Sequence, residues 1–457
     1  MANSYLTSNT GTATNAKKFT LSMWIKRSKL CDSNSQRFYQ GYKDGNDRFY
    51  VMFDNTSGTP DAIWIYAVTG GTVELYWTSS RRFRDTNGWY HFVFSADSTL
   101  GTAADRLKVY VNGVLETSFT KTNNPSQNID WGNQLAQTNN DLTISGTESQ
   151  TQLFDGYMSH VAFVDGQALA PTEFGETDST SGIWKFKSPS GITWGNNGYH
   201  LKFENSGNMG LDSSGEGNNF TVNGNLKQAL DTPSNVYCTL NPLDVFDDDG
   251  RTLSEGNLNF TTSSGNNGDI SGTIAASGSG KFYFETKVSA QSGSSSNAAR
   301  FGIIGVRDLS KTTPYVAGNS YYIYSDGRKE DGANTTNSAH PGYSLNDIVQ
   351  VALDLDNGNI YFGLNGNWGD NSGNFNQTFG NATAFFTSIN TDGFWSVYLQ
   401  KNVTADNVLT LSANFGNGYF GTTAITSAGS NGNGSLFEYD VPSGYYALNT
   451  KNINTYG

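Results

Sequence analysis

Closely spaced aromatic residues are the part of this sequence that points most directly to ligand binding. Trp64 and Tyr66 are two positions apart, and Tyr76 follows a short distance further along the chain. Residues two apart share one face of a β-strand, so these rings could stack on sugar rings while nearby Asn and Asp side chains bind the sugar hydroxyls. Large rings also fill β-sandwich cores or cover sheet edges, and the sequence leaves both interpretations open.

Oxygen ligands gather at Asp44, Asn46 and Asp47, in the string Asp-Gly-Asn-Asp. A calcium ion needs several carboxylate and carbonyl oxygens that converge from loops, and these three residues could supply some of them. The same string is typical of an ordinary turn, which is the alternative interpretation. The sequence predicts no other cofactor.

A second candidate binding surface lies in residues 315–331. This segment contains Tyr321, Tyr324 and Arg328, and we expect it to be a loop that exposes its aromatic side chains. Aromatic and arginine side chains carry much of the binding energy at recognition surfaces. The segment is therefore predicted to contact a partner.

The sequence predicts no catalytic residues. A retaining glycosidase needs two carboxyl groups about 5 Å apart, which on a strand means acidic residues on one face, and no strand with that pattern occurs. The acidic cluster at residues 173–178 follows Pro171 in a loop-like stretch. The four histidines lack a nearby nucleophile-elbow or oxyanion-loop pattern. We therefore expect a protein that is not an enzyme.

The elements that must position these residues are β-strands. Apolar and polar residues alternate with a period of two in residues 19–25, 89–94 and 107–111, and no stretch shows the period of an amphipathic helix. Asn-Gly pairs such as Asn112-Gly113 and Asn365-Gly366 supply the positive φ angles that tight hairpin turns need. The predicted fold is all-β, with two consecutive antiparallel β-sandwich (jelly-roll) domains.

Composition limits the classes of partner. The formal net charge of −13 argues against nucleic acid. There is no run of 18 or more apolar residues, so no membrane span is expected. The N-terminus has neither the charged nor the apolar region of a signal peptide.

A change of composition near residues 232–242 predicts the domain boundary. An acidic run at residues 247–249 and a new series of strands follow it. We therefore expect domains at 1–242 and 243–457. The segments 232–241 and 441–449 also resemble each other weakly, either as a shared closing segment or by coincidence.

The first domain resembles the laminin-G-like and concanavalin A-like jelly rolls. An early aromatic strand at residues 19–26 precedes the segment WYHFVFSADS at 89–98, a YVNG hairpin within 106–119, and a late strand within 153–174. The resemblance covers about residues 1–175. It implies two curved antiparallel sheets packed face to face. It also implies binding of glycan or protein, in some members with calcium, or in one branch hydrolysis of glycosides.

The second domain resembles the SPRY domain. The segments that carry this likeness are GKFYFETKV at 280–288, RFGIIGV at 300–306, the LDLDNG hairpin within 343–368, and ANFGNGYF at 413–420. The resemblance implies a bent β-sandwich that binds partners through loops and has no catalytic residues.

The string WGNNGYHLKFENS, within residues 194–206, is similar to the tails of jelly-roll proteins of bacteriophages. Together the resemblances imply a bacteriophage virion-surface structural protein, a tail or head fibre or receptor-binding appendage that recognises a host-surface glycan or protein. The alternatives are a capsid decoration protein that binds only virion components, and a polysaccharide depolymerase, which the missing carboxylate pair disfavours.

This interpretation also implies partners and a location. We expect contacts with other virion proteins and with a host-surface glycan, and a homo-oligomer formed through sandwich faces because the chain has no heptads. The expected location is the virion surface, after synthesis in the host cytoplasm without a signal peptide.

Overall fold

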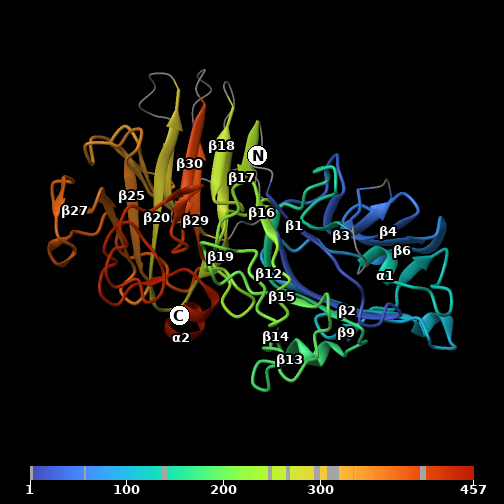
Figure 1. Ribbon diagram of the computed structural model, residues 1–457. Coiled ribbons are helices and arrows are strands. Elements are labelled where there is room, and N and C mark those ends of the chain that lie inside the picture. Colours follow the sequence, from blue (N-terminus) through green and yellow to red (C-terminus); the bar gives the residue numbers. More distant parts are fainter. Residues whose placement is uncertain are drawn as a thin grey trace. The chain divides into compact units, whose positions relative to one another are not determined.

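In the computed structural model nearly all regular secondary structure is β-strand, which confirms the predicted all-β fold (Figure 1). The chain folds into two compact units, Met1–Gln228 and Ala229–Gly457. The structure describes residues 4–55, 58–135, 141–244, 250–263, 268–292, 299–305, 319–332, 334–401 and 408–457.

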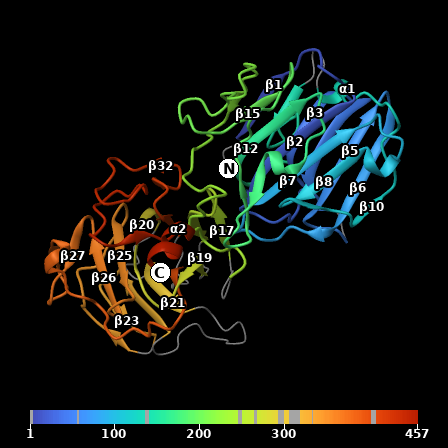
Figure 2. The ribbon, with the colours of Figure 1, turned by 90° about the horizontal axis from the view of Figure 1, so that it is seen from below.

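Two antiparallel sheets make up most of the first unit (Figure 2). The eight-stranded sheet has the order β10 (Phe119–Lys121), β6 (Thr72–Arg82), β5 (Ala62–Thr69), β4 (Asp47–Phe53), β3 (Gln36–Asp44), β11 (Asp141–Ile144), β1 (Tyr5–Asn9) and β16 (Thr221–Asn223). The six-stranded sheet has the order β15 (Tyr199–Leu201), β12 (Gly156–Asp165), β2 (Lys18–Arg27), β7 (Tyr90–Asp97), β8 (Leu107–Val111) and β9 (Val114–Leu115). The remaining elements are the hairpin β13 (Gly175–Thr177) and β14 (Trp184–Phe186), the helix α1 (Gly132–Leu135), and the 3₁₀ turns at Ala103–Asp105 and Pro171–Glu173.

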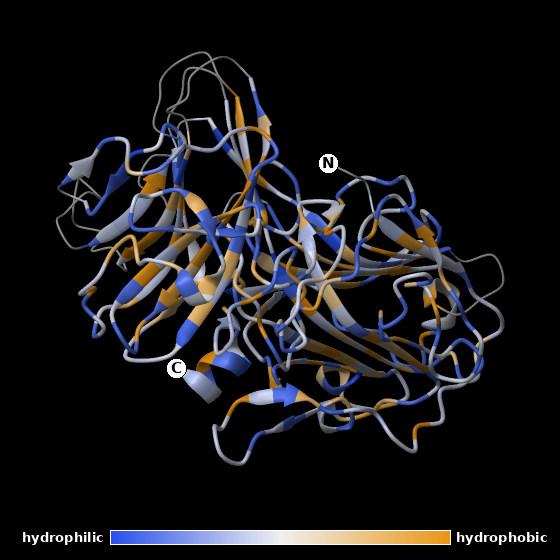
Figure 3. Cartoon of the chain, turned by 90° about the vertical axis from the view of Figure 1, so that its left-hand side faces the viewer, coloured by the Kyte–Doolittle hydropathy of each residue, from blue (hydrophilic) through white to orange (hydrophobic). Residues whose placement is uncertain are grey.

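Alternate residues of both sheets form one core. On β2, Leu21, Met23 and Ile25 are fully buried, and on β4 the same is true of Phe49 and Val51. Each such side chain stabilises the fold by roughly 1.5–3 kcal/mol through its removal from water. Figure 3 shows hydrophobic stretches interspersed with hydrophilic ones along the chain, and a strand places successive side chains on opposite faces of its sheet.

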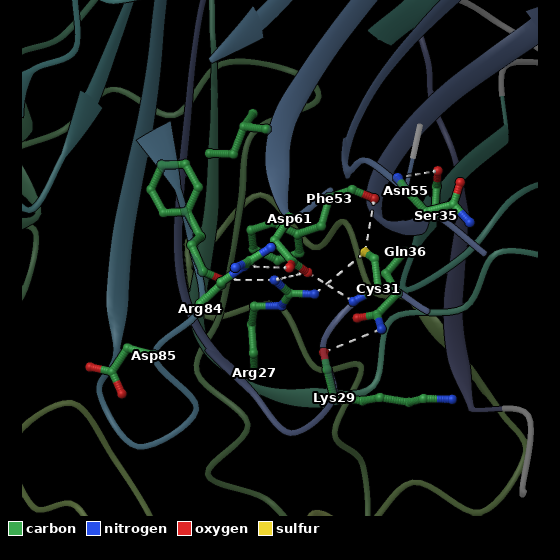
Figure 4. A network of polar contacts seen from close by, with 12 residues as sticks. Arg27, Lys29, Cys31, Ser35, Gln36, Phe53, Asn55, Asp61, Arg84 and Asp85 are labelled. Atoms are coloured by element: carbon green, nitrogen blue, oxygen red, sulfur yellow. Dashed lines mark hydrogen bonds and ion pairs between the residues drawn. The ribbon is translucent and has the colours of Figure 1, made fainter. Parts of the chain in front are cut away.

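A buried ion pair lies at one end of this core (Figure 4). Arg27 Nη1 is 2.9 Å from Asp61 Oδ1 and also donates to the carbonyl of Phe83. The other oxygen of Asp61 accepts from Arg84 Nε at 3.0 Å, and Asp61 Oδ1 also accepts from the amide of Cys31. The side chains of Arg27 and Asp61 are 0% and 3% exposed, so water does not screen their charges.

The chain that follows β12 covers the outer face of the six-stranded sheet. Ala162 and Val164 pack there against Phe174. Trp184 of β14 donates from Nε1 to Nδ1 of His91, which stacks on Trp24 with ring centroids 4.4 Å apart. This covering explains why nearly every residue of β2 is buried on both faces.

The second unit also contains two main sheets. One has the order β17 (Arg251–Ser254), β18 (Asn259–Thr262), β30 (Leu409–Asn414), β20 (Lys281–Gln291), β25 (Ile348–Asp354), β26 (Asn359–Leu364), β27 (Asn367–Gly369) and β28 (Phe375–Gln377), with β33 (Tyr446–Ala447) parallel to β20. The other has the order β19 (Gly268–Ala276), β29 (Trp395–Lys401), β21 (Ala299–Gly305), β22 (Ser320–Tyr324), β23 (Lys329–Glu330) and β24 (Thr335–Thr336). The remaining elements are the pair β31 (Tyr419–Phe420) and β32 (Thr423–Ala424), a 3₁₀ turn at Phe379–Asn381, and α2 (Thr450–Tyr456).

The predicted Asn-Gly turns are present in both units. Asn112 and Gly113 have φ angles of 50° and 78°, and Asn365 and Gly366 have 50° and 89°. A two-residue turn with positive φ at both positions matches the twist of the strands that it joins. Asn112-Gly113 therefore closes the β8–β9 hairpin, and Asn365-Gly366 closes β26–β27.

The unit boundary lies earlier than the expected 242/243. Cys238 and Leu240 are buried in the core of the second unit, and Leu240 pairs with Gly272. Tyr237 pairs antiparallel with Asn449, so the two segments with similar sequences lie side by side. Residues 229–242 thus belong to the second unit, because its core and its C-terminal segment bind them. The acidic run 247–249 lies outside the described residues.

Candidate functional site

An aromatic cluster lies on the face of the eight-stranded sheet that points away from the core. Trp64 and Tyr66 of β5 alternate with the buried Ile63, Ile65 and Ala67 and are partly exposed. Tyr76 of β6 is 40% exposed, and Tyr50 of β4 lies in register with Tyr66. We call Tyr50, Trp64, Tyr66 and Tyr76 the outer aromatic face. It contains all three aromatic residues that the sequence suggested in this domain.

The rings of the outer aromatic face contact one another. Tyr50 and Tyr66 are stacked with centroids 5.1 Å apart, and Trp64 is 5.1 Å from Tyr76. Tyr66 meets Tyr76 edge to face at 5.9 Å. Contacts at these distances hold the rings as a rigid group, which reduces the entropy lost when a ligand stacks on them.

Two arginines flank the rings. The guanidinium of Arg37 lies 3.8 Å from the centroid of Tyr50, and that of Arg48 lies 5.5 Å from the centroid of Tyr66. Burial raises the pKa of Tyr50 to about 12, while Arg37 and Arg48 both act in the opposite direction. Burial also lowers the pKa of Arg37, and the charge of Arg48 adds to this effect. Positive charge is therefore concentrated beside the aromatic rings.

Arg37 and Arg48 differ in their partners. Arg37 Nη1 donates to Gln40 Oε1, and Gln40 Nε2 donates to Glu148, whose charge partly offsets that of Arg37. The side chain of Arg48 has no hydrogen bond or ion pair with any described residue, and its Nε is enclosed. Trp64 Nε1 is likewise enclosed without a partner among the described residues. Arg48 thus contributes a positive charge that the described part of the chain does not neutralise.

From the sequence we did not identify three residues of this site, Tyr50, Arg37 and Arg48. The alternation of Arg48 and Tyr50 with the core residues Phe49 and Val51 carried the signal for two of them. Arg37 had no such signal, because a bulge between Arg37 and Tyr39 buries both Phe38 and Tyr39 in the core.

The candidate calcium ligands stabilise a turn between β3 and β4. Asp44 Oδ1 accepts from the amides of Asn46 and Asp47 at 2.7 and 3.1 Å. Asp47 Oδ1 accepts from the amide of Gly70 at 3.0 Å, and its other oxygen faces Lys43. No group of three or more His, Cys, Asp or Glu side chains that could hold a metal occurs among the residues that the structure describes. The geometry therefore supports the turn interpretation of this string.

The expected recognition loop is mostly strand and largely buried. Tyr324 is 1% exposed and Tyr321 is 8% exposed, because β22 packs into the second unit. Tyr324 lies between the guanidiniums of Arg300 at 4.4 Å and Arg328 at 4.0 Å, and its hydroxyl donates to Glu330. The exposed-loop prediction is wrong for these tyrosines, since Tyr321 belongs to the main core and Tyr324 packs on the other face of β22 against Tyr322 and Tyr398. Residues 315–318 lie outside the described residues.

The acidic cluster at residues 173–178 also has structural partners. Asp178 accepts from the amides of Thr180 and Ser181 and lies 3.0 Å from Lys185 Nζ. These bonds hold its pKa below the usual range. Glu176 lies 3.5 Å from the same ammonium group. Their arrangement suits a turn more than proton transfer.

A cavity of about 540 Å³ lies in the second unit, with Trp368, Phe379 and Val441 in its wall. Its acidic groups already have partners: Glu438 accepts from Thr426, and Asp440 accepts from the amide of Ser430. These bonds stabilise the surrounding loops, so both carboxylates are engaged in structural contacts.

Sequence comparison places the outer aromatic face in a known type of domain. Residues 1–174 match the concanavalin A-like lectin/glucanases superfamily, and this range includes all four rings and both arginines. The first unit contains a concanavalin A-like jelly roll. No curated protein matches the chain, and no described helix is long and apolar enough to cross a membrane.

Parts of the chain are similar to solved structures. The SPRY domain of human HERC1 shows 12% identity with a TM-score of 0.29, over 38% of this chain and 96% of that domain. Domain 4 of the extracellular arabinanase AbnA from Geobacillus stearothermophilus, in complex with arabinotriose, shows 18% identity and a TM-score of 0.25 over 35% of this chain and 65% of that one. The enzymatically active domain of bacteriophage CBA120 tailspike protein 2 shows 12% identity and a TM-score of 0.27 over 37% of this chain and 25% of that one.

Proposed function

We propose that the first unit binds a glycan, and that the sugar stacks on the outer aromatic face. The observation that carries this proposal is the group of partly exposed rings Trp64, Tyr66 and Tyr76, held together on the outer face of a concanavalin A-like domain. Aromatic faces pack against the C–H faces of sugar rings, and the hydroxyls of Tyr66 and Tyr76 can exchange hydrogen bonds with the sugar hydroxyls.

The whole chain is proposed to be a non-enzymatic structural protein of a bacteriophage virion surface that recognises a host-surface glycan. The virion assignment is supported by the similarity of residues 194–206 to the tails of jelly-roll proteins of bacteriophages. The non-enzymatic assignment is supported by the structural partners of the acidic cluster at residues 173–178. A cryo-electron map of the particle tests the assignment. A position at the distal end of an appendage supports it, whereas a position flush with the capsid lattice supports the decoration alternative.

Replacing Trp64 by alanine is expected to weaken glycan binding by about tenfold or more, because a tryptophan at the centre of a contact surface contributes at least ~1.4 kcal/mol. Glycan-array screening identifies the ligand, and titration calorimetry measures its affinity for each variant. Trp64→Phe keeps a stacking ring and should retain most of the affinity. Tyr76→Ala changes the most exposed ring and provides a second reading if Trp64→Ala does not fold.

Equal affinity in the Trp64→Ala and Tyr76→Ala variants would contradict binding at this face. A glycan array on which the wild-type chain binds nothing would contradict glycan binding itself. Release of reducing sugar from host polysaccharide by the purified chain would instead favour the depolymerase alternative.

A further inference from the structure

We infer that the outer aromatic face selects sugars that carry a carboxylate, such as uronic acids. This inference rests on the proposed glycan-binding function and adds the chemical class of the ligand. Arg48 and Arg37 are placed to bind the carboxylate, while the sugar ring stacks on Trp64, Tyr66 and Tyr76.

Both arginines lie next to the aromatic rings. Arg48 and Tyr50 are two apart on β4 and share its outward face, and Tyr50 is paired with Tyr66 of β5. Arg48 lies over Tyr66, and Arg37 lies over Tyr50. A group bound by either guanidinium is therefore next to the rings on which a sugar would stack. A hexuronic acid has its carboxylate attached directly to the sugar ring, which fits this adjacency.

Both arginines have N–H donors that no described residue uses. Neither Nη atom of Arg48 has a partner among the described residues, and neither is one of the enclosed unpaired atoms, so each keeps some contact with solvent. Arg37 uses Nη1 for Gln40 and keeps Nη2 free of described partners. A guanidinium binds a carboxylate through two parallel N–H···O bonds, which a neutral hydroxymethyl group cannot reproduce.

The charge of a ligand carboxylate would complement that of the two arginines. The chain has a net charge of −13, yet these two cations lie together, and each arginine near the other raises the cost of keeping both charged. Glu148 reaches Arg37 through Gln40, and no described acidic group forms an ion pair with Arg48. A ligand carboxylate would supply the missing negative charge. A neutral glycan would leave it uncompensated.

The test compares uronic-acid oligosaccharides with their carboxyl-reduced forms, which have the same linkages and ring stereochemistry but no charge. Galacturonate, glucuronate and mannuronate oligosaccharides are titrated calorimetrically into the full chain. We expect at least one acidic oligosaccharide to bind about tenfold or more tightly than its reduced form, because charge-assisted hydrogen bonds are stronger than neutral ones. Arg48→Gln should remove most of this difference, and added salt should weaken binding of the acidic form only.

Lys108 provides a matched control, because it is an exposed cation on β8 of the other sheet and its loss changes the net charge equally. Lys108→Gln should leave the preference for the acidic form unchanged. The inference is overturned if reduced and acidic forms bind equally, or if folded Arg48→Gln and Arg37→Gln variants keep the preference. Neutral binding that Trp64→Ala abolishes would then leave the proposed glycan-binding function intact. A lack of binding by both forms would overturn the inference about uronic acids, and the glycan array would then decide the glycan-binding proposal separately.

Discussion

The substitution Asp61→Asn is expected to lower the free energy of unfolding of the first unit by about 3–5 kcal/mol, because it leaves the buried Arg27 without a counter-ion. Arg27 is fully buried and its Nη1 lies 2.9 Å from Asp61 Oδ1. Asp61 has a φ angle of 64°, which asparagine also adopts readily, so the substitution changes charge without straining the backbone. Urea unfolding of the full chain, followed by hydrogen exchange in peptides from β2 and β5, measures the effect.

Two further variants test whether the loss of stability in Asp61→Asn comes from the unpaired charge of Arg27. Arg84→Gln removes the second partner of Asp61, and because the Arg84 side chain is 55% exposed this change should cost less than about 1 kcal/mol. The double variant Arg27→Met with Asp61→Asn removes both buried charges and should recover much of the loss. A change below about 1 kcal/mol for Asp61→Asn would show that Arg27 finds another counter-ion or becomes solvated.

Acidification from pH 7.5 to 5 is expected to destabilise the first unit through its histidines. Burial lowers the pKa of His91 and of His160 to about 3, and that of His200 to about 4. His91 Nδ1 accepts from Trp184 Nε1, so a proton on Nδ1 would break this bond and place two donors face to face. His160 Nδ1 lies 3.3 Å from His200 Nε2, an arrangement with room for one proton between the rings.

Protonation of these histidines favours the unfolded chain. Each histidine has a lower pKa in the folded state than the ordinary 6.5, so the unfolded chain binds protons first as the pH falls. The stabilisation is complete above pH 6.5 and is lost progressively toward the folded pKa values. At pH 5 the loss is about 2 kcal/mol for His91 alone. Lys202 adds to the depression at His160 and His200, whereas Asp212 opposes it at His200.

The second unit should respond differently over the same range. Burial raises the pKa of Glu285 to about 7, although Glu438, Tyr439 and Tyr283 all donate hydrogen bonds to it. The stability that protonated Glu285 provides is therefore lost as the pH rises from 4.5 through 7. The histidines change stability in the opposite direction. His340, whose pKa burial lowers to about 4, offsets part of this gain at low pH.

Hydrogen exchange of the full chain, corrected for the intrinsic effect of pH, reports on both units in one experiment. Protection of β2, β7 and β12 should fall between pH 7.5 and 5 more than that of β20, β25 and β30. His91→Gln supplies a donor and an acceptor but does not titrate, so it should reduce this pH dependence even where it lowers overall stability. Equal loss of protection in both units would contradict the prediction.

Much of the candidate site could be predicted from local sequence. Trp64 and Tyr66 lie on one face because side chains alternate along a strand, and that rule needs no knowledge of the fold. The local sequence does not show whether other parts of the chain cover such a face. The equally aromatic β22 is buried, since Tyr322 and Tyr324 pack against Tyr398 and Arg300 from distant parts of the chain.

The all-β architecture and the Asn-Gly turns could be predicted from the sequence, because alternation and positive φ angles are local properties of the backbone. Which rings are accessible, and which charged side chains lie beside them, depends on the packing of the whole fold. Arg37 reaches Tyr50 only through the bulge in β3, and Leu240 belongs to the second unit through its pairing with Gly272. Such contacts join residues far apart in sequence, and the burial that drives them depends on the complete set of packed strands.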